Sequence, residues 1–220
     1  MKKILLIVLL LSVGFSQKLI RGVDTDEDGS VSITYYKETQ NKLEKVKRVE
    51  YFSSGQMKSV GTHKDGKEDG LYTEWYENGQ KNKEGTFKDG KLNGLWSWWY
   101  NNGKKKSLGS YLNGDGTDKG VTGISRNGRD GLWSWWYVNG QIDLEITYKD
   151  GKKDGLETSW YVNGQKKEEG MSKNGKLDGL WTTWYENGKK KYEGTYKDGK
   201  LDGLWTTWYE NGQMEQERTY

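Results

Sequence analysis

Short runs of alternating residues recur along the chain, and each run is bounded by a glycine-containing turn signal. In residues 204–209, Leu, Thr and Trp alternate with Trp, Thr and Tyr. Alternation with a period of two, rich in Thr, Trp and Tyr, is typical of β-strands. Dipeptides such as Asp198-Gly199 and Asn211-Gly212 separate the runs. Both dipeptides accept positive φ, so we expect type I′ turns and an antiparallel β-meander.

These strand and turn signals repeat with a fixed period. The tripeptide Gly-Leu-aromatic begins at Gly179 and again at Gly203, which are 24 residues apart. The same tripeptide, or its Glu157 variant, also begins at Gly70, Gly94, Gly131 and Gly155. A second marker, Asn-Gly followed by Gln or Lys, begins at Asn78, Asn102, Asn139, Asn163, Asn187 and Asn211. Each unit is therefore expected to form one hairpin that stacks on its neighbours.

The alternation separates two faces of the expected sheet. One face carries Leu, then Thr or Ser, then Trp in every unit, and the other varies except for its final Tyr. We expect the unvarying face to be packed and the variable face to be wet. Partner strands carry glycines such as Gly85 and Gly194, over which a cross-strand Trp is expected to lie. An open sheet with one apolar face must curl or pair with another sheet. The expected fold class is therefore all-β, with one elongated, curved antiparallel sheet. Pairing of two such sheets in a homodimer is a further expectation.

The N-terminus predicts export. Lys2 and Lys3 precede a short apolar run and small residues, which together are typical of a signal peptide covering residues 1–16. The run is shorter than the ~20 residues that a membrane-spanning helix needs. Residues 17–45 are expected to form an N-terminal cap, and residues 46–220 the repeat array. The expected location is the periplasm, the cell envelope or the extracellular space.

Composition excludes several classes of protein. The chain has no Cys, so it has no lipid-attachment cysteine, disulfide or thiolate metal site. Its net charge is only +3, with both signs interspersed, so no broad basic field would attract nucleic acid. The same balance gives only weak support for binding to a membrane surface. Trp and Tyr, 12 and 15 residues respectively, supply the apolar burial.

The units resemble the bacterial variant of the MORN repeat. The shared pattern is an aromatic residue, a charged Asp-Gly turn, Gly-Leu-Trp, and then Trp-Tyr-Glu-Asn-Gly, as in residues 192–213. The resemblance covers residues 46–220 and implies a scaffold or membrane-tethering module. Proteins of this kind are often labelled antitoxin-like, which fits poorly with export. Choline- and glucan-binding wall repeats also use Trp-Tyr hairpins, but their shorter units match less well.

One interruption and the tryptophans beside it are the candidate site. Gly94 and Gly131 are 37 residues apart, and the extra residues lie in an insertion at 113–127. The insertion is either a functional protruding loop or a tolerated one. Exposed tryptophans flanking it would form a partner site, whereas a dimer or the insertion itself would cover them. The candidate partner-binding residues are Trp96, Trp98, Tyr100, Trp133, Trp135, Tyr137, Trp181 and Trp205.

Little in the sequence points to metal or catalytic chemistry. Asp24, Asp26 and Asp28 form half of a calcium loop, but Tyr35 stands where a bidentate Glu is needed, so an acidic turn is the alternative. His63 fills a slot that is aromatic in other units, and reads as a repeat variant. We expect no enzyme and no cofactor. The predicted function is an exported scaffold that binds a protein partner, with a cell-envelope glycan-binding module or an antitoxin-like protein as alternatives.

Overall fold

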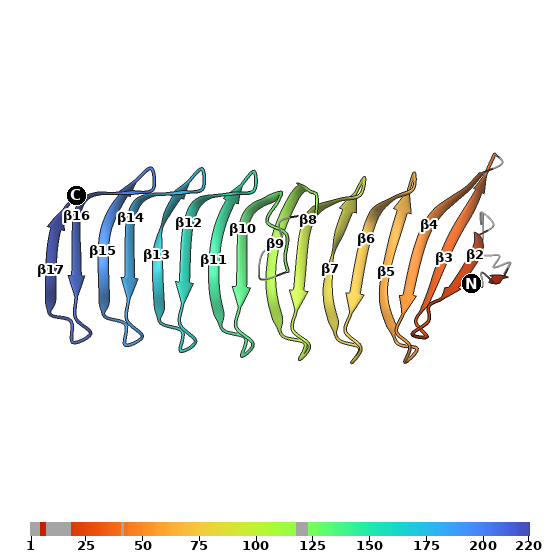
Figure 1. Ribbon diagram of the computed structural model, residues 1–220, viewed down its shortest axis with the longest axis horizontal. Coiled ribbons are helices and arrows are strands. Elements are labelled where there is room, and N and C mark those ends of the chain that lie inside the picture. The colour runs from red at the N-terminus through yellow and green to blue at the C-terminus, as the bar shows by residue number, and fades with distance from the viewer. Residues whose placement is uncertain (1–4, 8–18, 41, 118–122) are drawn as a thin grey trace. The chain divides into compact units, whose positions relative to one another are not determined.

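The computed structural model describes residues 5–7, 19–40, 42–117 and 123–220. The regular structure in these ranges is all β, arranged as successive antiparallel hairpins (Figure 1), which confirms the predicted fold class. Within them, no helix is long and apolar enough to cross a membrane. The predicted signal peptide lies outside the described residues apart from 5–7, and the insertion is described without 118–122.

The chain divides into two compact units, which are taken separately. The first unit, Met1–Gly103, begins with the short strand β1 (Leu5–Ile7), which pairs with β2 (Leu19–Thr25). The predicted cap region contains the hairpin of β2 and β3. The remaining strands of this unit are β2 (Leu19–Thr25), β3 (Val31–Thr39), β4 (Lys42–Tyr51), β5 (Met57–Lys64), β6 (Lys67–Trp75), β7 (Lys81–Lys88) and β8 (Lys91–Trp99).

The second unit, Lys104–Tyr220, continues the same pattern after the insertion. Strand β9 pairs with β10 on the far side of the insertion, and each later strand pairs with the next. The strands are β9 (Lys105–Gly114), β10 (Arg129–Trp136), β11 (Ile142–Lys149), β12 (Lys152–Trp160), β13 (Lys166–Lys173), β14 (Lys176–Trp184), β15 (Lys190–Lys197), β16 (Lys200–Trp208) and β17 (Met214–Thr219).

The Asp-Gly turns have the predicted geometry. Asp198 and Gly199 have φ values of 51° and 84°, and Asp65 and Gly66 have 49° and 78°. Positive φ at both central residues is the signature of a type I′ turn, and Gly and Asp accept it more readily than most residues.

The Asn-Gly turns differ from the prediction. In the last copy Gly212 has a positive φ of 89°, whereas Asn211 is not among the positive-φ residues. Gly212 N–H donates to the carbonyl of Tyr209, so the turn begins at the tyrosine. The side chain of Asn211 accepts a hydrogen bond from the N–H of Gln213 at 2.9 Å, which fixes the turn locally. The expected type I′ turn is therefore wrong at these positions.

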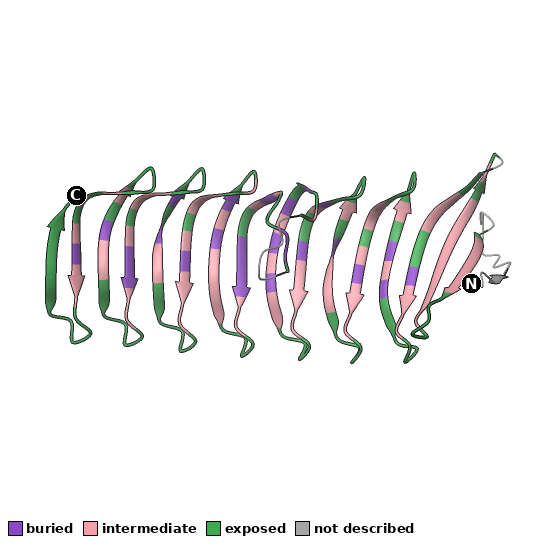
Figure 2. Ribbon diagram, viewed as in Figure 1, coloured by how far each residue is buried: buried purple, intermediate pink, exposed green. Residues whose placement is uncertain are grey.

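Burial also differs from the prediction (Figure 2). On the unvarying face the middle Thr or Ser is mostly buried, as at Thr73 and Thr182, but the Leu is exposed in every unit. On the variable face Trp96 and Trp133 are only 2 % and 0 % exposed. The prediction that the variable face is the wet one is therefore wrong at these tryptophans. The reason is that each indole lies flat on the preceding strand, where Gly85 or Gly109 leaves room for it.

Candidate functional site

The predicted packing of a cross-strand aromatic ring over a glycine is confirmed. Gly85 lies directly opposite Tyr72, and a Cβ added to it would overlap the indole of Trp96. In the second unit a Cβ on Gly109 would overlap the indole of Trp133 in the same way. Each indole N–H also donates to a main-chain carbonyl, from Trp96 to Thr86 at 3.1 Å in the first unit. These tryptophans are therefore held as packing elements of the sheet.

Neighbouring rings complete the packing in the first unit. The ring of Phe87 meets that of Trp96 edge-on with centroids 5.1 Å apart. The ring of Tyr72 stacks on that of Trp96 with centroids 6.3 Å apart, and the ring of Trp98 lies 5.8 Å from that of Trp96. Aromatic pairs in this range add to the apolar burial of each ring. The flat exposed strip that the sequence suggested is absent at Trp96, because its faces are covered.

In the second unit, residues of the insertion help to hold the arginine that covers the tryptophans. Arg129 is 4 % exposed, and its guanidinium lies 4.4 Å from the ring centroid of Trp133 and 5.1 Å from that of Trp135. It donates to the main-chain carbonyls of Ile124 and Ser125, at 3.2 and 2.9 Å. Since Ile124 and Ser125 belong to the insertion, this part of it is fastened to the aromatic cluster. Trp135 itself is 9 % exposed.

The fixed tyrosine of each unit connects one hairpin to the next. Tyr137 donates its hydroxyl to the carbonyl of Trp160 at 2.6 Å, and Tyr185 does the same to Trp208 at 2.8 Å. Burial, followed by a hydrogen bond with Asp143, raises the pKa of Tyr137 to about 12. This contact explains why the tyrosine does not vary within the chain.

The remaining candidate residues are half-buried. Trp181 and Trp205 cover Gly170 and Gly194, and Trp205 also stacks on Tyr192 with centroids 5.6 Å apart. Tyr100 lies at the turn after β8 and is half-buried. A role in partner binding for these residues stays a prediction.

The acidic segment before β3 forms a hairpin turn. The main-chain carbonyl of Asp26 accepts a hydrogen bond from Gly29 N–H at 3.0 Å, and the carboxylate of Asp28 accepts one from Ser30 N–H at 2.9 Å. This last hydrogen bond lowers the pKa of Asp28. Within the described ranges, no group of three or more acidic or histidine side chains could hold a metal ion. The geometry is that of the acidic turn that the sequence offered as the alternative to a calcium loop.

An exposed leucine row is the surface that sequence reasoning missed. In the second unit four leucines and one methionine, 44–56 % exposed, occupy one register: Leu132, Leu156, Met171, Leu180 and Leu204. Leu71 and Leu95 hold the same place in the first unit, at 58 % and 59 %. Leucines recur on every second strand, so their spacing is about 10 Å. We call these residues the leucine row. Its signal in the sequence is the repeated Leu itself, which the unvarying pattern assigns to a packed face.

A polar link runs beside the leucine row in several hairpins. Thr182 donates to Glu193 at 2.9 Å, Lys190 forms an ion pair with the same carboxylate at 2.6 Å, and Lys190 also lies 5.7 Å from the ring centroid of Trp208. Equivalent links join Lys81 to Glu84 and Trp99, and Lys166 to Glu169 and Trp184. The leucines therefore project from a face whose other side chains are held in place.

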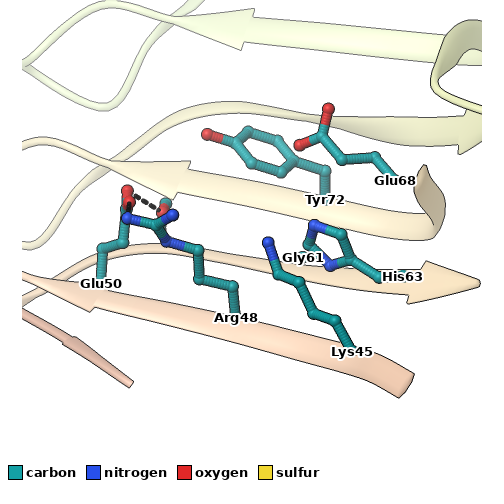
Figure 3. A pocket seen from close by; sticks show the side chains of 8 residues that line it. Lys45, Arg48, Glu50, Gly61, His63, Glu68 and Tyr72 are labelled. Atoms are coloured by element: carbon teal, nitrogen blue, oxygen red, sulfur yellow. Dashed lines mark hydrogen bonds and ion pairs between the residues drawn. The ribbon is translucent and has the colours of Figure 1, made fainter. Parts of the chain in front are cut away.

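A cavity of about 270 Å³ opens in the first unit, on the face of the sheet opposite to the leucines (Figure 3). It is lined by side chains of β4, β5 and β6: Lys45, Arg48, Glu50, Ser59, Gly61, His63, Glu68 and Tyr72. Glu50 forms an ion pair with Arg48 at 2.8 Å and accepts a hydrogen bond from Ser59 at 2.8 Å. The negative charge of Glu50 is therefore balanced by Arg48, which also lines the cavity.

The surroundings disfavour the charged form of two basic groups in this cavity, Lys45 and His63. Burial and then the charge of Arg48 lower the pKa of Lys45. Burial and then the charge of Lys45 lower the pKa of His63. The Nδ1 atom of His63 is buried and has no hydrogen-bond partner among the described residues. The sequence does not predict this site, because the repeat pattern gives His63 the place that Phe87 occupies in the next unit.

Comparison with known proteins identifies the repeats. The family model described as MORN repeat variant matches residues 68–89, 92–113, 129–150, 177–198 and 201–220. No curated protein matches the chain. Among solved structures, the chain is similar to a porin-like protein from Bacteroides uniformis ATCC 8492, with 11% sequence identity over 91% of this chain and 88% of that one, and a TM-score of 0.21. At that TM-score the structural likeness carries no argument.

Proposed function

This chain is a MORN-variant repeat protein, and we propose that it is an exported, non-enzymatic scaffold that binds a protein partner through its leucine row. The observation that carries the proposal is the half-exposed leucine at one register in every repeat hairpin, 48–59 % exposed. Repeated apolar exposure of this kind marks interaction surfaces on soluble proteins. A repeat array presents such a surface over a long stretch of chain.

The spacing of the row favours an amphipathic helix as the occupant. Leucines two strands apart are separated by about 10 Å. Residues seven apart on an α-helix are separated by about 10.5 Å, so an apolar residue at every seventh position would meet successive leucines. The small net charge of +3 with both signs interspersed favours such an apolar contact over nucleic acid or an anionic membrane.

Export is the second part of the proposal, and it rests on residues 1–16. Cell fractionation and N-terminal sequencing of the protein from its native cells test it. Processed chain beginning at Gln17 outside the cytoplasm is the expected result. Unprocessed chain confined to the cytoplasm would contradict export and would favour the antitoxin-like alternative.

Site-specific cross-linking tests the leucine row. A photoreactive residue replaces Leu180, and captured peptides are identified by mass spectrometry. We expect cross-links to a partner helix with an apolar residue at every seventh position. In a second experiment, Leu156→Ser with Leu204→Ser should weaken capture at least about tenfold, because each buried Leu contributes about 1.5–3 kcal/mol.

A matched control tests whether partner capture depends on the leucine row or on any exposed apolar side chain. Val138 and Val162 lie in the Asn-Gly turns away from the row and are 58 % and 52 % exposed. Val138→Ser with Val162→Ser should leave capture unchanged. Equal loss in both double variants would overturn the assignment of the row. Cross-links only between copies of this chain would replace the external partner with a homodimer.

A further inference from the structure

The cavity on β4, β5 and β6 exists because this hairpin departs from its neighbours at two positions. In the next hairpin Trp96 covers Gly85, and Phe87 stands beside it. At the cavity the corresponding residues are Tyr72 over Gly61, and His63. The Tyr ring is smaller than an indole, and a histidine replaces an apolar ring. The packed aromatic face is therefore opened and made polar at one place.

The lining charges balance one bound negative charge only when His63 is protonated. Arg48 and Glu50 neutralise each other through their ion pair at 2.8 Å. Lys45 forms no ion pair with any described residue, although Glu68 stands across the cavity (Figure 3). With His63 neutral, Lys45 and Glu68 balance, so the cavity carries no net charge. One anion together with one proton on His63 would keep that balance, whereas a dianion would leave an excess negative charge.

We propose that this cavity binds the carboxylate group of a small organic acid between Lys45 and His63. Lys45 supplies a charged donor, and protonated His63 supplies a second, so both can bond one carboxylate. A cavity of about 270 Å³ is larger than a bare carboxylate requires and accommodates a small organic body against the ring of Tyr72. The site goes beyond the proposed scaffold function, because the leucine row lies on the opposite face of the sheet.

Proton uptake follows from the groups that face His63. On β4 these are Lys45, Arg48 and Glu50, and on β6 they are Glu68 and Tyr72. Burial and Lys45 hold the pKa of His63 below its ordinary value of 6.5 in the free protein. The negative charge of a bound carboxylate stabilises the protonated imidazole, and therefore raises the pKa of His63. By reciprocity, the carboxylate binds more tightly to the protonated form, and its affinity falls as pH rises through the pKa of His63.

The test uses the single histidine of the chain. In untagged full-length protein, the C2–H resonance of His63 is titrated by NMR at constant ionic strength, with sodium acetate or with acetamide, its neutral analogue. Acetate is expected to raise the pKa of His63 and acetamide is not. Each unit of that rise corresponds to about tenfold tighter binding to the protonated protein.

Three variants keep His63 observable and make the test specific. Lys45→Gln should weaken acetate binding about tenfold or more. Lys47→Gln, at an exposed position of the same strand on the other face, should not change it. Tyr72→Trp, which restores the larger ring of the next hairpin, should fill the cavity and abolish the response.

Several outcomes would overturn the proposal. They are an equal response to acetate and acetamide, an unchanged response in Lys45→Gln, or tighter binding of inorganic phosphate than of acetate. None of them bears on the leucine row, since the cross-linking experiment probes the other face.

Discussion

Gly85 lies beneath Trp96 and Gly109 lies beneath Trp133, the two most buried tryptophans of the variable face, and the missing side chain lets each indole lie flat. Trp133, at 0 % exposure, shows how complete the cover becomes without a second sheet. A Trp removes about 150–250 Å² from water, which corresponds to roughly 4–6 kcal/mol of transfer free energy. At the residue scale, therefore, a single layer of strands gains its apolar burial from rings lying along the sheet.

Gly85→Ala tests this contact. The added Cβ would overlap the indole of Trp96, so the ring must shift and the free energy of unfolding should fall by about 1–3 kcal/mol. Urea unfolding followed by Trp fluorescence measures the change. Gly61→Ala is the matched control, because its Cβ would lie 3.0 Å from the ring of Tyr72 and demands a smaller shift. Equal destabilisation of the two variants would contradict the argument.

The tyrosine contact between hairpins predicts a second residue-scale effect. Tyr137→Phe removes the hydroxyl that donates to the carbonyl of Trp160, and should lower the free energy of unfolding by about 0.5–1.5 kcal/mol. Tyr209 holds the same repeat position at the last hairpin and is 50 % exposed. Tyr209→Phe should therefore change stability little in the same urea titration. A larger effect at Tyr209 than at Tyr137 would show that the contact is not the cause.

The sequence predicted the pairing of Gly with Trp but not which face is covered. Alternation assigns Leu204 and Trp205 to opposite faces, and nothing in a period of two says which of them meets other side chains. In a two-layer protein the unvarying Leu would be core. Here Leu204 is 51 % exposed, because the rings cover their own face and none of the residues that the structure describes forms a layer over the other.

At the scale of the element, several hairpins are held to the next by a charged link as well as by rings, as at Lys190, Glu193 and Trp208. Burial opposes ionisation of Glu193, but hydrogen bonds from Lys190 and Thr182 outweigh it and lower its pKa below the ordinary 4.5. Because the folded pKa is depressed, the stabilisation from this carboxylate is present above the unfolded value of 4.5 and is lost as pH falls through the folded value.

Glu193→Gln should reveal that pH dependence. At about pH 7 the variant should unfold at lower urea than the original protein, and the gap should narrow as pH falls below 4.5 and then through the lowered pKa of Glu193. Glu215→Gln, on the exposed last strand, serves as the control and should show no such gap. The proposed link is contradicted if the gap stays constant over the acid range.

Element-scale features explain why the cavity and the role of the insertion were not predicted. The repeat register places His63 at an aromatic position, and that reading is correct for the backbone. The cavity needs Tyr72 and His63 to depart from their repeat positions in the same hairpin, and needs Lys45 from the preceding strand. Likewise, Arg129 follows the insertion in sequence, but only the fold places its guanidinium over Trp133. Both depend on contacts between strands that spacing along the chain does not reveal.

At the scale of the molecule, repetition makes stability nearly a sum of hairpin and interface contributions. In the second unit, β12, β13, β14 and β15 each pair, among the described strands, with the strand before and the strand after them. A whole repeat can therefore be removed without breaking any pairing pattern, whereas half a repeat cannot, because it would reverse the direction of every later strand.

Deletion of residues 181–204, one full 24-residue repeat, tests that expectation and the leucine row together. The deletion joins Leu180 directly to Trp205, so the Leu-Trp order of the strand is kept. The shortened protein should remain folded, with a smaller urea m-value because less surface is exposed on unfolding. Deletion of residues 181–192 alone should instead abolish cooperative unfolding. If the row binds its partner along several repeats, the full-repeat deletion should also weaken capture while the fold persists. A folded deletion protein with undiminished capture would confine binding to the leucines outside the deleted repeat.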